Sequence, residues 1–289
     1  MTRRPQISFL ADGRRLHLQD GPIDLIVEAR GGEANVRLAY DAAAHRFTGL
    51  LDQLCDELPE LRRAADPARC PLRGTVARRM HAAVAPFAAE HFITPMAAVA
   101  GAVAEEILGA MLREAQLERA YVNNGGDIAL VLTPGSRYDI GVVSDPLRGS
   151  LDGAISVSAE SGIRGIATSG WHGRSFSLGI ADSVTVLART AAQADAAATL
   201  VANAVNAEHP AVRRAPACSI KDDTDLGERL VTIAVDTLPG AVVDAALARG
   251  RAFAQELCAG GLIIAAWLTL QGRGRAVGQD HRVQIMEAA

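Results

Sequence analysis

Residues 121–128 read Tyr-Val-Asn-Asn-Gly-Gly-Asp-Ile, and residues 195–199 read Asp-Ala-Ala-Ala-Thr. The first stretch places two glycines and an acid between apolar segments at 120–122 and 128–132, a pattern that predicts two strands. The second lies in a segment, 191–207, whose small apolar residues predict a helix. An Ala-Thr-Ser-Gly motif at 167–170 comes between them. The order of these three motifs carries most of what the sequence indicates about fold and function.

The Asn-Asn-Gly-Gly-Asp segment at 123–127 has two interpretations. Glycines at a strand end permit positive φ and let the backbone approach a ligand closely. Backbone N–H groups exposed there can hold a phosphate. A tight turn between two strands explains the same residues, because Asn-Gly pairs are common in such turns. Read alone, the segment favours the turn.

The helix expected at 191–207 places Asp195 and Thr199 on one face, since residues four apart are neighbours on a helix. Asn203 and Asn206 extend this face. An almost wholly apolar helix is buried, and a buried carboxylate needs a partner or a metal ion. Carboxylate, hydroxyl and carbonyl oxygens are ligands for Mg²⁺ or Ca²⁺. The alternative is structural: Asp195 braces a neighbouring element and the Thr199 hydroxyl bonds to its own helix.

A third candidate region, residues 165–174, reads Gly-Ile-Ala-Thr-Ser-Gly-Trp-His-Gly-Arg. Small polar residues after a strand suit a binding loop, where Trp171 or His172 would cover a ring or a phosphate. His172 is also a candidate general base, although a single loop histidine is more often structural. The chain has no Gly-x-Gly-x-x-Gly after a strand and no Walker-type lysine, so it lacks the standard nucleotide motifs.

Composition limits the class of protein. The 289 residues have a net charge of −4, with 49% hydrophobic and 21% charged residues, which favours a globular domain and argues against a nucleic-acid partner. The four cysteines, Cys55, Cys70, Cys218 and Cys258, form no metal motif and suit a reducing compartment. The late apolar run at 261–270 is too short for a membrane span. We therefore expect a cytoplasmic protein with no membrane partner.

Away from these motifs, strands are expected within 14–40, with Gly31-Gly32 as a turn and a further strand through Val36 and Leu38. Helices are expected at 45–63, 75–90 and 96–115, with Thr94 as N-cap and Pro95 in the first turn of the last. Further strands are expected at 138–143, 154–159, 165–168 and 183–188. The chain then continues as strand 230–235, helix 241–258 and strand 262–270. Strands in neighbouring hairpins with inserted helices indicate an α+β fold.

The ordered motifs resemble the ApbE superfamily, the FAD:protein FMN transferases, over about residues 90–207. The segments around Phe92-Ile-Thr-Pro and Asp225-Leu-Gly-Glu resemble the shorter, functionally uncharacterised branch of that superfamily. The resemblance implies one ApbE-like domain over 1–289, with antiparallel or mixed sheets, packed helices and two intimately packed lobes. An N-terminal lobe, 1–75, and a C-terminal strand-helix-strand unit, 228–275, would pack on the core.

The resemblance also implies a function: Mg²⁺-dependent binding of FAD or FMN, with transfer of FMN from FAD to an acceptor protein or cleavage of FAD. It implies that Mg²⁺ is held by Asp195, Thr199 and the carbonyl of Ala100. The flavin nucleotide would then contact two motifs, Asn124, Gly125, Gly126 and Asp127 in one, and Ala167, Thr168, Ser169 and Gly170 in the other.

This sequence departs from the transferases after the Ala-Thr-Ser-Gly loop. The transferases have a histidine-rich segment running into Asp-Pro-x-Thr-Gly, whereas residues 171–182 are shorter and lack it. The Lys-Gly that follows the alanines of the early helix is also missing. His172 or Asp182 would have to serve as the catalytic group instead.

Two other functions stay open: a non-catalytic flavin-binding or assembly protein, and an enzyme that acts on another small substrate in a rebuilt pocket. The alanine- and glycine-rich helices suit a homodimer seam as readily as a core.

Overall fold

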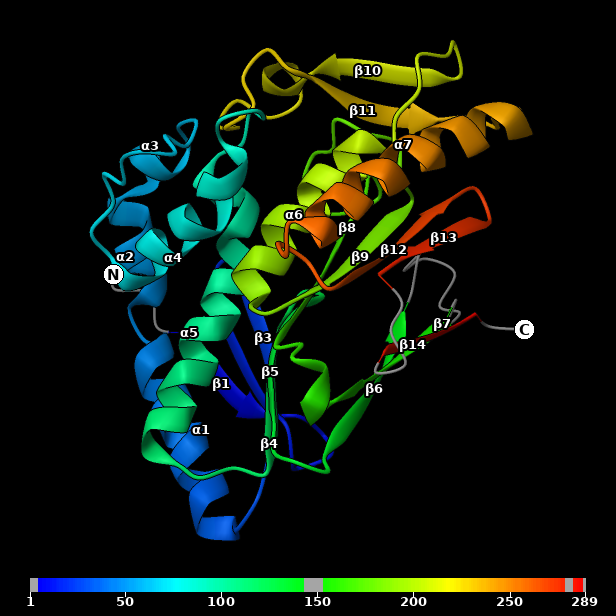
Figure 1. Cartoon of the computed structure of the whole chain (residues 1–289). Helices are drawn as coiled ribbons and strands as arrows, with labels where there is room; N and C mark the ends of the chain where they lie inside the picture. Colours follow the sequence, from blue (N-terminus) through cyan, green and yellow to red (C-terminus); the bar gives the residue numbers. More distant parts are fainter. Residues whose placement is uncertain (1–4, 143–152, 279–282, 288–289) are drawn as a thin grey trace.

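The computed structural model describes residues 5–142, 153–278 and 283–287, and its main feature is a nine-stranded sheet (Figure 1). The strand order is β1-β2-β3-β4-β5-β8-β9-β12-β13, and every pair of neighbours is antiparallel. Strands from both ends of the chain therefore share one sheet. The bounds are β1 Gln6–Phe9, β2 Leu16–Asp20, β3 Ile23–Arg30, β4 Arg119–Asn124, β5 Asp127–Leu132, β8 Gly165–Ser169, β9 Ser183–Ala188, β12 Ala265–Leu270 and β13 Arg273–Val277.

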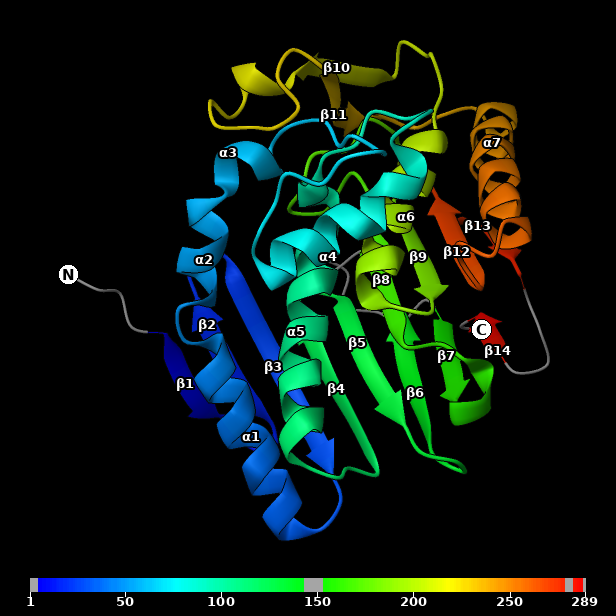
Figure 2. The same cartoon turned by 60° about the vertical axis from the view of Figure 1, so that its left-hand side comes forward.

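Helices cover one face of this sheet (Figure 2). The main core lies between the two layers, where strand residues such as Leu25 and Val122 and helix residues such as Phe47 and Met111 are buried. The helices are α1 Glu33–Phe47, α2 Leu50–Asp56, α3 Leu58–Leu61, α4 Thr75–Val84, α5 Val99–Glu114, α6 Ala191–Ala204 and α7 Gly240–Ala259. Short 3-10 helices are η1 Ala85–Phe87, η2 Pro95–Ala98, η3 Ala159–Ser161 and η4 Ala217–Ser219.

A three-stranded sheet packs on the opposite face of the large sheet (Figure 1). It consists of β6 Arg137–Val142, β7 Gly153–Ser158 and β14 Val283–Glu287 in the order β14-β7-β6. A second hydrophobic cluster, which includes Leu130, Ile155 and Trp267, lies between the two sheets. A separate antiparallel ribbon, β10 Val212–Pro216 and β11 Leu230–Val235, lies at the top of Figure 1. Helices thus cover one face of the large sheet, and the three-stranded sheet packs on part of the other, open face, which is an α+β arrangement.

The α+β class predicted from the sequence is confirmed, and its sheets are antiparallel within the described residues. The strands expected at 183–188 and 230–235 match β9 and β11 exactly at both ends. Most of the other expected strands and helices agree to within a few residues. Val143, the last residue of the strand expected at 138–143, lies outside the described residues.

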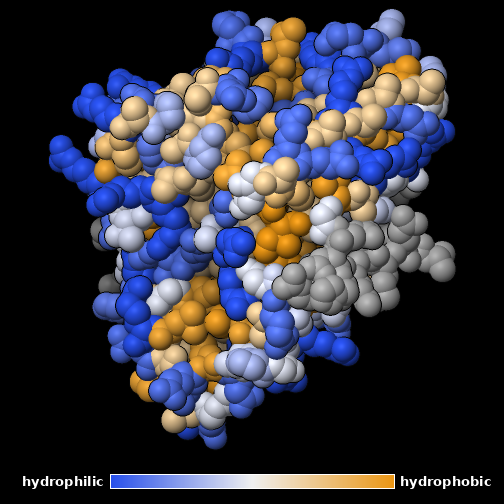
Figure 3. Space-filling model, in the orientation of Figure 1, coloured by the Kyte–Doolittle hydropathy of each residue, from blue (hydrophilic) through white to orange (hydrophobic). Residues whose placement is uncertain are grey.

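The strand expected through Val36 and Leu38 is wrong, because these residues belong to α1. Ala39, Tyr40, Ala43 and Phe47 are the buried residues of α1, and this spacing of three to four is helical. Leu38 is 51% exposed, so its apparent alternation with Val36 does not reflect a sheet face. Figure 3 shows hydrophobic surface low on the face of the molecule that is seen in Figure 1.

The helix expected at 45–63 is three separate segments in the structure, the end of α1 followed by α2 and α3. Gly49, with φ of +78°, breaks the pattern between α1 and α2. The strands β1, β10, β13 and β14 were not predicted. Thr94 lies at the N-cap position of η2 but forms no capping hydrogen bond; its hydroxyl donates to Asp225 Oδ2 instead.

The helical stretch Pro95–Glu114 is long and apolar enough to span a membrane by length and composition. An 18-residue window within it has a mean hydropathy of 1.4, but 61% of that window is buried inside the protein. Its small residues, among them Gly101, Ala102 and Ala104, are buried in contact with the rest of the chain. This stretch is therefore a core helix of the fold.

Close packing of α5 on α6 brings the small-residue segment around Gly101 next to the helix that carries Asp195 and Thr199. A Cβ at Gly101 would lie 2.3 Å from the carbonyl oxygen of Ala191, so only glycine permits this approach. The Glu105 carboxylate accepts a hydrogen bond of 2.8 Å from the N–H of Ala192, which satisfies one of the free donors at the start of α6. The first turns of α5 and α6 are consequently in direct contact.

We expect Gly101→Ala to destabilise the protein by about 2–3 kcal/mol, because the new methyl group would overlap fixed backbone atoms of α6. Gly109→Ala is the matched control on the same helix. There the nearest atom to the new Cβ is an Arg113 side-chain nitrogen at 3.5 Å. The control should therefore stabilise the protein by about 0.5–1 kcal/mol through helix propensity. Urea denaturation of both variants measures the difference; equal free energies of unfolding would contradict the close packing.

Candidate functional site

The Asn-Asn-Gly-Gly-Asp segment forms the turn of the β4–β5 hairpin. Asn124 pairs with Asp127 across the turn, and the two residues between them, Gly125 and Gly126, have φ of +65° and +112°. Two positive φ angles favour glycine at both positions. The Asn123 Oδ1 atom accepts a hydrogen bond of 2.8 Å from the N–H of Gly126, which fixes the turn. The turn interpretation is thus correct for the backbone, and it places polar side chains on both faces of the sheet.

On the helix-covered face, this hairpin lies against the start of α5. The Asn124 Nδ2 group donates a hydrogen bond of 3.2 Å to the carbonyl of Ala100. The N–H of the next residue, Gly101, donates to Asp195 Oδ2 at 3.0 Å. Asp127 Oδ1 accepts from the N–H of Thr168 at 3.2 Å. Four segments that are far apart in the sequence therefore meet at one point.

Asp127 and Asp195 form an electrostatically coupled carboxylate pair. Burial raises the pKa of Asp127 well above its ordinary value, and the neighbouring charge of Asp195 raises it further. The N–H of Thr168 and the charge of Arg174 act in the opposite direction. Burial also raises the pKa of Asp195, to about 7, against the effect of the N–H groups of Gly101 and Ala100. Two adjacent carboxylates without a cation are costly, so this is where a cation or a proton is favoured.

The donor set of this pair fits Mg²⁺. Two carboxylates and the nearby Ala100 carbonyl offer oxygen atoms only, which hard cations prefer. Thr199 lies one turn after Asp195 on α6, half-buried, and its hydroxyl forms no hydrogen bond to another described residue. In the described ranges no three His, Cys, Asp or Glu side chains gather as a metal site. Mg²⁺ suits so sparse a set, because it keeps several waters and binds through one or two carboxylates and substrate phosphates.

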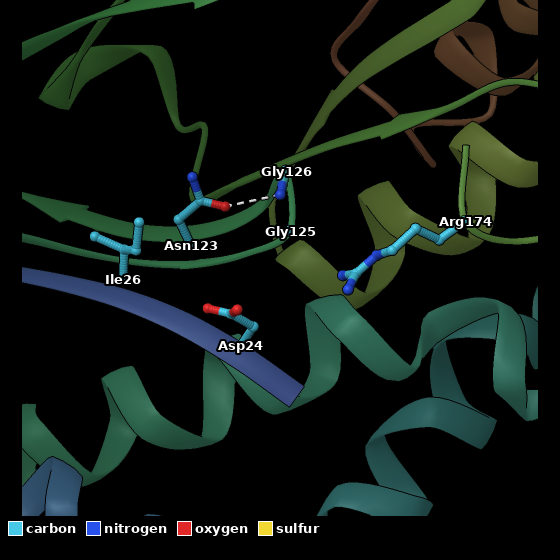
Figure 4. Close-up of a pocket in the computed structure, with 6 residues that line it drawn as sticks. All are labelled: Asp24, Ile26, Asn123, Gly125, Gly126 and Arg174. Atoms are coloured by element: carbon cyan, nitrogen blue, oxygen red, sulfur yellow. Dashed lines mark hydrogen bonds between the residues drawn. The ribbon is translucent and has the colours of Figure 1, made fainter. Parts of the chain in front are cut away.

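On the other face of the sheet, the same hairpin borders a pocket of about 340 Å³. Leu25 and Val27 of β3 point into the main core, so the alternating side chains of Asp24 and Ile26 point the other way. The pocket is lined by Asp24, Ile26, Asn123, Gly125, Gly126 and Arg174 (Figure 4). The hairpin turn thus separates the carboxylate pair on one face from a ligand-sized pocket on the other.

The loop after β8 carries His172 and ends at Asp182. His172 Nε2 lies 3.6 Å from Asp182 Oδ1, and the His172 ring lies against that of Trp171, with ring centroids 3.8 Å apart and an interplanar angle of 36°. Asp182 also accepts hydrogen bonds from the Trp171 indole at 3.4 Å and from the N–H of Gln271. The two predicted catalytic residues are therefore brought together, with Asp182 held in place by two further donors.

The residues of the Ala-Thr-Ser-Gly motif, and Asn203, make contacts within the fold. Ala167 is buried in the main core, and Gly170 lets the backbone of Asp182 approach closely, since a Cβ there would be 2.2 Å from its carbonyl oxygen. The Thr168 hydroxyl is bonded to that of Thr185, and Ser169 is half-buried at the end of β8. Asn203 accepts a hydrogen bond from the N–H of Leu178, so it braces a loop rather than extending the site.

Sequence reasoning missed the residues that line the pocket on the open face. Asp24 and Ile26 come from β3, about a hundred residues before the hairpin, and only the pairing of β3 with β4 brings them beside it. Arg174 was part of the quoted loop but had no role assigned. The pairing of Asp127 with Asp195 was also not foreseen. No local sequence signal marks these neighbours.

Comparison with known proteins identifies the family. A family model described as AbpE bacteria matches residues 7–277. A UPF0280 protein of Methanopyrus kandleri is 34% identical over 218 residues, covering 74% of this chain and 84% of that protein. UPF0280 proteins of Methanothrix thermoacetophila and Methanospirillum hungatei are 42% and 40% identical over 114 and 112 residues. Those two matches span 46% and 45% of the relatives' own length.

Among solved structures, the apo form of Pseudomonas stutzeri flavinyl transferase ApbE matches with a TM-score of 0.47 and 13% identity, covering 99% of this chain and 96% of that one. The family assignment rests on the sequence matches, which span most of the chain. The protein belongs to the bacterial ApbE-like family and is related to the UPF0280 proteins.

Proposed function

We propose that the protein binds a flavin nucleotide, FAD or FMN, together with Mg²⁺ at the β4–β5 hairpin. The observation that carries the proposal is the coupled pair Asp127 and Asp195, held beside the Ala100 carbonyl. A buried carboxylate pair favours a cation or a proton, and the pocket beside it has the size of a small-ligand site. Membership of the ApbE-like family and the motifs at 121–128 and 195–199 support the flavin nucleotide as the ligand.

In this proposal Asp127, Asp195 and Thr199 hold Mg²⁺, which when bound neutralises charge that develops on a phosphate. At Gly126 of the turn no atom lies within 4 Å of the position a Cβ would take, so a phosphate can come close to the backbone there. His172 accepts a proton from the hydroxyl of an acceptor protein, or from water when FAD is cleaved. The Asp182 carboxylate, 3.6 Å from His172 Nε2, stabilises the positive charge of the protonated ring.

The enzymatic part is tested by incubating the purified protein with FAD and Mg²⁺, with and without candidate acceptor proteins, and measuring AMP and FMN. We expect AMP to be released in the presence of Mg²⁺ and not in EDTA. His172→Gln should lower the rate about 100-fold or more while FAD binding is retained. FAD that binds but is never cleaved or transferred would rule out the enzyme.

A non-catalytic flavin-binding protein is the second candidate. Asp182 is already occupied by the Trp171 indole and the N–H of Gln271, and its 3.6 Å separation from His172 is longer than a hydrogen bond. These contacts suit a structural role for Asp182. In that case FAD and FMN should bind with Mg²⁺ dependence and remain intact.

A further inference from the structure

Arg174 is the cation of the open-face pocket. Its guanidinium lies directly over the hairpin turn, because a Cβ on Gly125 would be 2.3 Å from Arg174 Nη2. Figure 4 shows the side chain reaching from the loop after β8 toward Gly125 and the space above Asp24.

This guanidinium is not engaged in an ion pair with the described part of the chain. No described carboxylate lies within 4.0 Å of it, although Asp24 lines the same pocket. Asp24 is instead paired with His17 Nε2 at 2.9 Å. Among the described residues, Arg174 is therefore an exposed cation without a carboxylate partner at the mouth of a pocket, whereas Arg46 and Arg79 are both paired with Glu106.

We propose that Arg174 is the anion-binding residue of this pocket and that the ligand carries a phosphate or pyrophosphate group. The planar guanidinium forms two parallel hydrogen bonds to a phosphate, which combine charge with orientation. At the turn such a phosphate would lie between Arg174 on the open face and the carboxylate pair on the helix side. The ligand would extend into the pocket beside Asp24, Ile26 and Asn123.

The inference deepens the proposed function and rests on it for the identity of the ligand. It adds a residue and a preference: the site selects a phosphorylated ligand over the same molecule without its phosphate. FMN and riboflavin differ by just this group, and inorganic pyrophosphate carries the group without the flavin.

The experiment measures binding of pyrophosphate, FMN and riboflavin by titration calorimetry in Mg²⁺, using the full chain and three variants. In the wild type we expect pyrophosphate to bind and FMN to bind at least about tenfold more tightly than riboflavin, as for a charge-assisted hydrogen bond. Arg174→Gln should weaken pyrophosphate about tenfold or more and remove the preference for FMN. Arg174→Lys keeps the positive charge but loses the planar guanidinium, so its affinity for pyrophosphate should lie between those of the wild type and Arg174→Gln.

Arg251→Gln is the matched control, since Arg251 is exposed on α7 and its loss removes the same charge. It should leave all three affinities unchanged. Thermal unfolding of each variant shows that it is folded. Because Arg174 is exposed, its replacement should not lower the melting temperature by more than the control does.

The outcomes separate the two proposals. Pyrophosphate binding that depends on Arg174, without binding of FMN, riboflavin or FAD, would support the anion site and contradict the flavin ligand. Flavin binding that is equally strong for FMN and riboflavin, and unchanged in Arg174→Gln, would overturn the anion site. A wild type that does not bind pyrophosphate in Mg²⁺ would overturn it as well.

Discussion

Asp195→Asn is expected to abolish Mg²⁺ binding while making the metal-free protein more stable. The amide keeps an oxygen that accepts the N–H of Gly101, so the junction of α5 and α6 is preserved. It removes a negative charge that burial and Asp127 make unfavourable. We expect a gain of roughly 2 kcal/mol in the free energy of unfolding at pH 8 in EDTA, since a carboxylate pKa raised by a few units opposes folding there.

Mg²⁺ should raise the melting temperature of the wild type in a concentration-dependent way and have no effect on Asp195→Asn, because a ligand of the native state stabilises it by mass action. Asp222→Asn is the control, since Asp222 is an exposed carboxylate in another loop. It should retain the full response to Mg²⁺. A metal response that persists in Asp195→Asn would place the metal elsewhere, and a loss of stability would show that Asp195 serves the fold.

The second large effect is on the pH dependence of stability. A group whose pKa is raised in the folded state binds a proton more tightly there than in the unfolded chain. Its contribution to stability is complete at low pH and is lost as the pH rises through the folded-state pKa. For Asp195 this window runs from about pH 4 to just above its pKa of about 7, and the pKa of Asp127 is raised as well.

Carboxylates with lowered pKa act in the opposite direction but at lower pH. Asp244 is one of them: its hydrogen bond to Arg273 lowers its pKa, so its contribution is lost only in acid, below about pH 4. Between pH 5 and 8.5 the metal-free protein should therefore lose stability as the pH rises, by about 2–4 kcal/mol in all. Urea midpoints measured in EDTA across this range give the slope.

The double variant Asp127→Asn, Asp195→Asn should remove that slope, and saturating Mg²⁺ should remove it in the wild type. Mg²⁺ competes with protons for the same oxygens, so its affinity should rise over the same pH range. A wild type whose stability in EDTA is level or rises between pH 5 and 8.5 would contradict the coupled pair.

Local sequence patterns were sufficient for the parts of the fold that local physics determines. The strand at 183–188 is mostly apolar, with only Ser183 and Thr185 polar, and all six side chains are buried, so its pattern left little choice. The Asn-Asn-Gly-Gly-Asp turn was recognisable because positive φ at two successive positions is specific to glycine-rich hairpins. The segment at 33–40 misled because Val36 and Leu38 alternate, while the helical partners Ala43 and Phe47 lie beyond that window.

The site needed information that a local pattern does not hold. The sequence pointed to Asp195 and Thr199, which are on one helix, and to Asp127, which is in a turn. The coupling of Asp127 on β5 with Asp195 on α6 depends on how α6 packs against the sheet, and the N–H of Gly101 on α5 holds the Asp195 carboxylate. Likewise Arg174 meets Gly125 only because the loop after β8 returns to the hairpin. Such contacts are set by the whole fold, so spacing along the chain cannot reveal them.

We propose that the carboxylate pair and the hairpin together hold Mg²⁺ and a phosphate-bearing flavin nucleotide. The most direct test of this claim is the affinity for FAD of the wild type and of Asp127→Asn, Asp195→Asn, each in Mg²⁺ and in EDTA. We predict that the wild type binds FAD at least about tenfold more tightly in Mg²⁺ than in EDTA, and that the double variant shows no such difference. Equal affinity of the wild type in Mg²⁺ and EDTA, or no binding of FAD in either, would contradict the claim.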